Sequence, residues 1–244
     1  MGSTVTGCIY MSVFCVLAIL NTILAVAIRK TKALWTEWNY RIIVHLSIMD
    51  LINLVPTFGA GISSLVALGL PHVINQGFTV ISLAIPQSVV VLSVTLALNR
   101  LIVIRKQELL NTPKFYKVMI AVSYICGFFW LTVYGLTTMD VSFGFDQEHQ
   151  NFSVTTDNLK TVKWFIGASF IELNLCKLYL LCGLICCGIV AFTLGRQALS
   201  AGGTSQPTVV GPGTFFCSLL PFLYLLLERN SQWYDNLLTF YFWQ

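Results

Sequence analysis

Apolar residues follow one another along this chain in long runs, and few polar residues interrupt them. Several runs reach the roughly 20 residues that an α-helix needs to cross a lipid bilayer. The pattern therefore predicts membrane-spanning helices at Gly7–Ile28, Arg41–Leu68, Phe78–Ile104, Lys117–Met139, Ile171–Leu194 and 207–227, the last with its apolar part at Thr214–Leu227. A shorter apolar stretch begins near Asn236, and it predicts the start of a seventh span.

The composition agrees with this pattern. Hydrophobic residues make up 56% of the 244 residues and charged residues only 10%, whereas a soluble domain carries about 25% charge. A soluble protein with buried helices is the alternative, but runs this long and this often repeated disfavour it. We expect an all-α fold, namely a polytopic transmembrane helical bundle of six full spans plus the start of a seventh, with residues 1–244 forming one domain.

The positions of lysine and arginine predict the orientation of the bundle. Ten of the fourteen basic residues flank alternate loops: Arg29, Lys30, Lys32, Arg41, Arg100, Arg105, Lys106, Lys114, Lys117 and Arg196. The opposite side has only Lys160, Lys163 and Arg229. Because basic loops stay in the cytoplasm, the N-terminus is expected outside. The first apolar run has no basic segment before it, so we expect a retained helix and no cleaved signal peptide.

The long loop between the fourth and fifth spans contains the sequon Asn151-Phe152-Ser153. N-glycosylation occurs only on the lumenal side, so Asn151 is a candidate acceptor that agrees with the charge count. The same loop is rich in acidic residues and histidine: Asp140, Asp146, Glu148, His149 and Asp157. These side chains form either an ordinary solvated loop or a surface that gathers ligands.

Motifs for catalysis are missing from the sequence. There is no Ser/His/Asp set, no HExxH, no glycine-rich phosphate loop and no His/Cys spacing typical of a metal site. We therefore expect no enzyme activity and no cofactor. The net charge of +4 comes from the loop residues described above, so it does not indicate a nucleic-acid partner. Nearly all eight cysteines lie in apolar runs, and Cys182–Gly188 is rich in small residues that favour close helix packing.

A few polar residues lie inside the predicted spans. Asp50, in the stretch LSIMDLINLVP, is the least expected, since a charged group in hydrocarbon costs roughly 2.5–3.5 kcal/mol or more. We expect it to face the bundle interior, where Asn21, Asn53 and His45 could supply partners. It is either a hydrogen-bonding hub or a switch that binds a cation or a proton. Pro56 follows and predicts a kink in this helix.

These spaced residues resemble the rhodopsin-like seven-helix G-protein-coupled receptors. Asn21, the Asp50 of LSIMDL and Trp130 stand at positions that the family marks. Asn99-Arg100 stands where the family has Asp-Arg-Tyr, and Ser218-Leu219-Leu220-Pro221 where it has Cys-Trp-x-Pro. The run YRIIVHLSIMDLINLVPTFGAGI followed by LALNR is most similar to class T of the nematode serpentine chemoreceptors.

The chain also departs from the family pattern. Asn99 replaces the usual acid beside Arg100, Leu219 replaces the TM6 tryptophan, and Val89 replaces a serine of the usual sodium site. The seventh helix would lie beyond Gln244, so the chain resembles a receptor truncated at its C-terminus. A non-signalling fragment is therefore one alternative function, and a transporter or channel is another.

The resemblance implies a chemosensory receptor of the plasma membrane that binds a small extracellular molecule and signals to a heterotrimeric G protein. It implies that Asn99 and Arg100 contact the G protein, that Asn21, Asp50 and Asn53 form a sodium-site-like switch, and that Pro221 kinks TM6. Candidate ligand-binding residues in the outer halves of the helices are Gln87, Ser88, Asn174 and Lys177. Three alternatives stay open: Lys177 snorkels to the interface, Gln87 and Ser88 bind backbone groups freed by Pro86, and Glu172 is interfacial.

Overall fold

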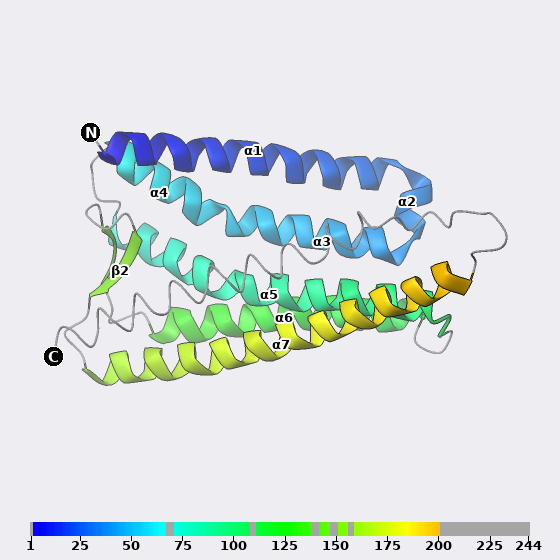
Figure 1. Cartoon of the computed structure of the whole chain (residues 1–244). Helices are drawn as coiled ribbons and strands as arrows, with labels where there is room; N and C mark the ends of the chain where they lie inside the picture. The colour runs from blue at the N-terminus through cyan, green and yellow to red at the C-terminus, as the bar shows by residue number, and fades with distance from the viewer. Residues whose placement is uncertain are drawn as a thin grey trace.

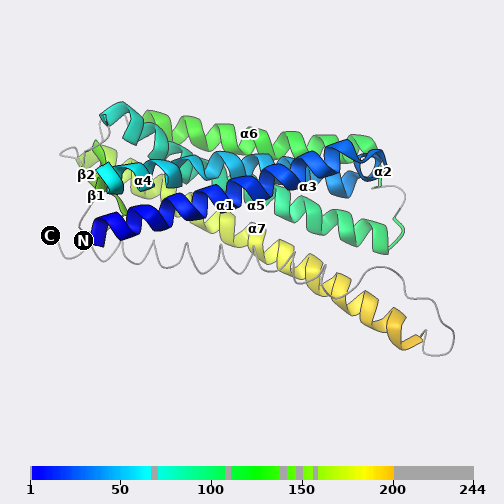
Figure 2. The same cartoon turned by 90° about the horizontal axis from the view of Figure 1, so that it is seen from above.

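The computed structural model describes residues 2–66, 71–107, 111–137, 142–146, 151–155 and 159–200. Their elements, in chain order, are α1 (Gly2–Lys30), α2 (Lys32–Thr36), α3 (Trp38–Asn53), α4 (Val55–Val66), α5 (His72–Ile104), α6 (Pro113–Thr137), β1 (Ser142–Asp146), β2 (Asn151–Thr155) and α7 (Leu159–Ser200). The long helices lie side by side and run up and down in alternation (Figures 1 and 2).

The architecture confirms the predicted all-α polytopic bundle. Within the described residues, five helices are long and apolar enough to cross a membrane: Thr4–Lys30, Trp38–Leu65, Val73–Ile104, Pro113–Leu136 and Ile166–Thr193. They overlap the first five predicted spans. The predicted sixth span, Pro221 within it and the start of the seventh lie outside the described residues.

The second span is interrupted where proline predicts an interruption. Helix α3 ends at Asn53, Leu54 forms a turn, and α4 begins at Val55. Pro56 lies in the first turn of α4, where its missing N–H removes no intrahelical bond of that helix. The Leu54 N–H still donates to the Asp50 carbonyl at 3.0 Å, and the Phe58 N–H donates to the Leu54 carbonyl at 3.1 Å. The chain therefore changes direction here without losing the span.

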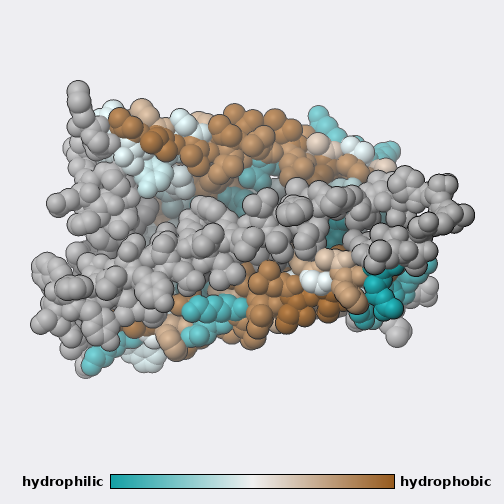
Figure 3. Space-filling model, in the orientation of Figure 1, coloured by the Kyte–Doolittle hydropathy of each residue, from teal (hydrophilic) through white to brown (hydrophobic). Residues whose placement is uncertain are grey.

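Helix α5 lies at the centre of the described bundle, and its apolar core residues face several helices. Ile85, Val89 and Leu92 pack with Ile42 and Met49 of α3 and with residues of α6. Val90 and Val94 pack with Cys176 and Leu180 of α7. The outward faces of α1 and α6 carry exposed apolar side chains, and those of α1 appear as brown surface (Figure 3). An apolar exterior is what a bilayer requires.

Glycine allows two helix pairs to approach closely. A Cβ added to Gly61 of α4 would lie 2.9 Å from Cγ of Met11 in α1, and one added to Gly7 would lie 2.7 Å from Cγ of Leu65. Between α5 and α6, a Cβ on Gly127 would lie 2.0 Å from the Ser88 hydroxyl oxygen. Small residues at such crossings are typical of membrane helices, where close backbone packing contributes to association.

A two-stranded antiparallel hairpin lies at the end of the bundle where α1 begins (Figure 1). Ser142 pairs with Thr155, and Asp146 pairs with Asn151. The candidate glycosylation residue Asn151 is thus the first residue of β2. This end is opposite α2 and opposite the end of α5 (Figure 1), so the hairpin and the basic loops lie at opposite ends.

We expect Gly127→Ala to lower the stability of the bundle by about 1–3 kcal/mol, because the new methyl group overpacks the contact with Ser88. Gly135→Ala on the same helix is the matched control: nothing lies within 4 Å of its added Cβ, and alanine favours the helix. Thermal unfolding in detergent micelles measures both. Equal melting temperatures for the two variants would contradict the close α5–α6 contact.

Candidate functional site

A buried polar cluster joins three helices in the half of the bundle nearer the hairpin. Gln87 of α5, Tyr134 of α6 and Glu172 of α7 are 0%, 0% and 4% exposed. The Gln87 amide Nε2 donates to Glu172 Oε1 at 2.6 Å, and the Tyr134 hydroxyl donates to Glu172 Oε2. One carboxyl group therefore accepts hydrogen bonds from both neighbouring helices, and it ties α7 to α5 and α6.

Aromatic and small side chains surround this cluster. The Trp130 ring lies against the Tyr134 ring with centroids 5.7 Å apart and planes inclined by 30°. Both side chains pack with Ala84 of α5, and Cys126 packs against the same group. These apolar contacts fix the Tyr134 ring, and they keep water from its hydroxyl, so its bond to Glu172 lies in surroundings of low polarity. Electrostatic interactions are stronger there than in water.

The side chains of Gln87 and Ser88 form hydrogen bonds to neighbouring helices, and not to the backbone carbonyl that lacks a donor because of Pro86. The Ser88 hydroxyl donates to the Ser123 carbonyl of α6 at 2.9 Å, and Gln87 reaches Glu172 of α7. The Gln87 side-chain oxygen is buried and has no hydrogen-bond partner. This orphaned acceptor is costly to bury, and it is available to a donor group on a bound molecule.

The two other candidate ligand residues lie elsewhere on α7. Asn174 and Lys177 are exposed, and the Asn174 side-chain amide donates to the Phe170 carbonyl of its own helix at 2.8 Å. They do not join Gln87 and Ser88 in the described bundle. The expectation that Glu172 is interfacial is wrong, because its side chain is buried among three helices. Glu172 and Cys176, one turn apart, are two of the α7 residues that face α5.

The candidate switch residues are not joined to one another by hydrogen bonds in the described structure. Asn21 donates to the Leu17 carbonyl of its own helix at 3.1 Å. His45 Nδ1 lies 2.9 Å from the Tyr124 hydroxyl, and this contact links α3 to α6. Asp50 and Asn53 are partly buried, and the described residues supply no hydrogen bond to the Asp50 carboxyl group. The sodium-site-like arrangement stays a prediction.

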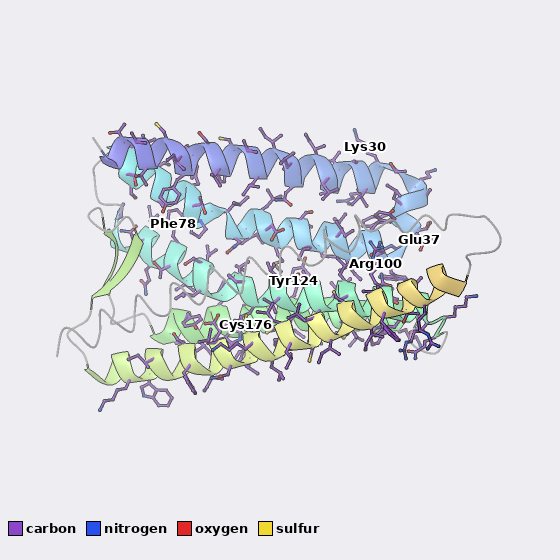
Figure 4. The ribbon with its side chains drawn as sticks, viewed as in Figure 1. Lys30, Glu37, Phe78, Arg100, Tyr124 and Cys176 are labelled. Atoms are coloured by element: carbon purple, nitrogen blue, oxygen red, sulfur yellow. The ribbon has the colours of Figure 1, made fainter. Side chains whose placement is uncertain are left out.

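Asn99 and Arg100 lie at the other end of α5. Asn99 is 2% exposed, and Arg100 is partly buried, with a buried Nε that has no hydrogen-bond partner. Arg100 lies at the end of the bundle that also carries Lys30 and Glu37, whereas Phe78 lies toward the opposite end (Figure 4). Next to this pair, Ala97, Leu98 and Leu101 pack against Cys186 and Cys187 of α7.

Sequence reasoning missed Tyr124 and Tyr134 and placed Glu172 at the interface, although all three make contacts between helices. One signal could have found the last two. Trp130 and Tyr134 are four residues apart on α6, and so are Glu172 and Cys176 on α7, so each pair occupies one helix face. A carboxylate on the same face as residues that pack against α5 is an interior residue and not an interfacial one.

The described residues contain no group of three or more His, Cys, Asp or Glu that could hold a metal ion. Comparison of the sequence with protein-family models gives no match, and comparison with curated proteins gives none either. The proposed function therefore rests on the geometry of the buried cluster and of α5.

We expect Tyr134→Phe to lower the stability of the bundle by about 1–3 kcal/mol, since a buried carboxyl group then loses one of its hydrogen-bond donors. The control is Asn174→Ala, which changes an exposed residue of α7 that binds only its own helix, and we expect less than about 0.5 kcal/mol. Thermal unfolding in detergent provides the measurement. If Tyr134→Phe melts with the parent protein, the cluster does not hold the three helices together.

Proposed function

We propose that this protein is a chemosensory receptor that binds a small organic molecule from outside the cell and passes the signal to a heterotrimeric G protein. The multi-pass membrane architecture is consistent with this function. The observation that carries the proposal is the arrangement along α5. This one helix holds Gln87 in the buried polar cluster near the middle of its length, with Ser88 beside it, and Asn99-Arg100 near its C-terminal end.

The binding step uses the buried cluster in the outer half. A small molecule with a hydrogen-bond donor reaches the free Gln87 oxygen, and it competes with Gln87 or Tyr134 for the Glu172 carboxyl group. Either event changes the bonds that tie α7 to α5 and α6. A molecule that binds one arrangement of these helices better than another shifts the population between them.

The output step uses the inner end of α5. Gln87 and Arg100 are thirteen residues apart, which corresponds to about 20 Å along a helix. Arg100 lies about one turn before α5 ends at Ile104, and its buried Nε lacks a partner. A shift of α5 against α7 changes the surroundings of this guanidinium. In the proposed receptor, Arg100 then turns toward the G protein.

The orientation that this function needs has the hairpin end outside the cell. All ten basic residues of the alternate loops lie in α2 or near those ends of the long helices that are opposite the hairpin (Figure 1). The positive-inside rule assigns that end to the cytoplasm. The plasma membrane is the proposed location, because an external molecule must reach the outer half.

The function is tested in cells that express the chain with a G-protein reporter and receive a panel of small organic compounds. We expect at least one compound to raise the reporter signal, and Arg100→Ala to abolish that signal while surface expression persists. Arg105→Ala is the matched control, since it removes the same charge from the exposed end of the helix. Gln87→Ala is expected to weaken the apparent affinity for the compound.

Three outcomes would contradict the proposal. An undiminished reporter signal with Arg100→Ala would remove that residue from the output step. A compound-dependent ion current or uptake that persists without G proteins would favour the transporter or channel alternative. Retention of the parent chain inside the cell without any response would favour the non-signalling fragment.

We expect Asn151 to carry an N-linked glycan, because the proposed orientation places β2 on the lumenal side during synthesis. Glycosidase treatment of the membrane-expressed protein should increase its gel mobility, and Asn151→Gln should abolish that shift. Ser153→Ala is an independent control, since it destroys the sequon but keeps the asparagine. An epitope in this loop that is labelled only after permeabilisation would reverse the orientation.

A further inference from the structure

The inner end of α3 holds a guanidinium group on an aromatic platform. The Arg41 guanidinium carbon lies 4.5 Å from the centre of the Trp38 ring and 5.4 Å from the centre of the Trp35 ring. Its Nε donates to the Trp35 carbonyl at 2.6 Å. Cation–π contacts and this hydrogen bond hold the guanidinium in one place. Within the described residues, its two terminal nitrogens have no hydrogen-bond or ion-pair partner.

The same platform extends to α6 and to two lysines. The Trp38 and Tyr116 rings stack with centroids 5.6 Å apart and planes inclined by 23°, so the start of α6 lies beside the start of α3. Lys114 and Lys117 flank Tyr116 on α6 and are exposed. In the described part of the chain, no carboxylate pairs with Arg41 or with either lysine. Three cations are therefore available near one aromatic platform.

These groups lie at the starts of two of the candidate membrane spans. Arg41 is three residues inside the span that begins at Trp38, and Lys114 and Lys117 belong to the first turns of the span that begins at Pro113. Tryptophan and tyrosine favour this depth because one end of each ring system is apolar and the other is polar. Beyond Lys117, the apolar side chains Val118, Val122 and Ile125 are exposed along one face of α6.

We propose that this corner between α3 and α6 binds the headgroup of an anionic phospholipid. The flat guanidinium of Arg41 matches the geometry of a phosphate group and can donate two parallel hydrogen bonds. Lys114 and Lys117 add charge for a headgroup that carries more than one negative charge. The acyl chains lie along the exposed apolar face of α6, a contact that a soluble phosphate cannot make. A lipid is therefore the occupant.

The proposal is tested with the purified chain in detergent micelles, titrated with fluorescent phosphatidylinositol 4-phosphate. We expect Lys114→Gln/Lys117→Gln to weaken binding about thirtyfold, because each basic residue near an anionic headgroup contributes about fivefold in affinity. Arg41→Lys keeps the charge but loses the paired hydrogen bonds, and it is expected to weaken binding several-fold. Unlabelled phosphatidylserine should compete weakly, and phosphatidylcholine should not compete.

The matched control is Lys30→Gln/Lys32→Gln, which removes two exposed charges from the same end of the bundle but not from the platform. We expect less than about a twofold change. An equal loss in this control would mean that diffuse charge and no specific site attracts the lipid. Binding of inositol 1,4-bisphosphate as tight as that of the lipid would mean a site for soluble anions, and unchanged binding by the Lys114/Lys117 variant would also overturn the proposal.

This test is independent of the proposed receptor function. The three cations lie outside the cluster of Gln87, Tyr134 and Glu172, and the readout is lipid affinity and not signalling. In micelles both ends of the bundle are accessible, so the result does not depend on which end faces the cytoplasm. Thermal unfolding of each variant without added lipid checks that the bundle itself is intact.

Discussion

The cost of an unpaired polar group in hydrocarbon determines where polar side chains stand in this bundle. No water satisfies such groups in the bilayer core, so each one needs a partner within the protein. Most hydroxyl and amide groups find that partner in their own helix. Thr22, Thr95 and Thr193 all donate to the carbonyl four residues earlier, and so these residues place no demand on neighbouring helices.

Among the described helices, several polar contacts cross between neighbouring helices. Ser88 meets the Ser123 carbonyl, His45 meets Tyr124, and Glu172 receives Gln87 and Tyr134. Each involves α5, α6 or both, so the centre of the bundle is held by hydrogen bonds as well as by packing. Helix α1 approaches α4 closely at Gly7 and Gly61.

The sequence predicted the fold because membrane spans have a signal that depends on length and apolarity alone. The five described spans fall within a few residues of their predicted places, and Pro56 marked the break of the second span because proline restricts the backbone wherever it occurs. The candidate site was harder to predict. Which side of a helix faces inward depends on its rotation. The predicted α7 residues Asn174 and Lys177 are two and five positions from Glu172, and they lie on the exposed side of the helix, whereas Glu172 is buried.

The cost of an unpaired polar group also applies to Lys177 and Asp50, whose charged groups have no hydrogen-bond partner among the described residues. Lys177 is exposed and lies eleven residues inside the span that begins at Ile166, which is about 16 Å of helix. An ammonium group this deep cannot face lipid without a substantial penalty. Asp50 poses the same problem on α3, because its carboxyl group has no hydrogen-bond partner among the described residues. We therefore expect water or further polar groups to lie against both side chains.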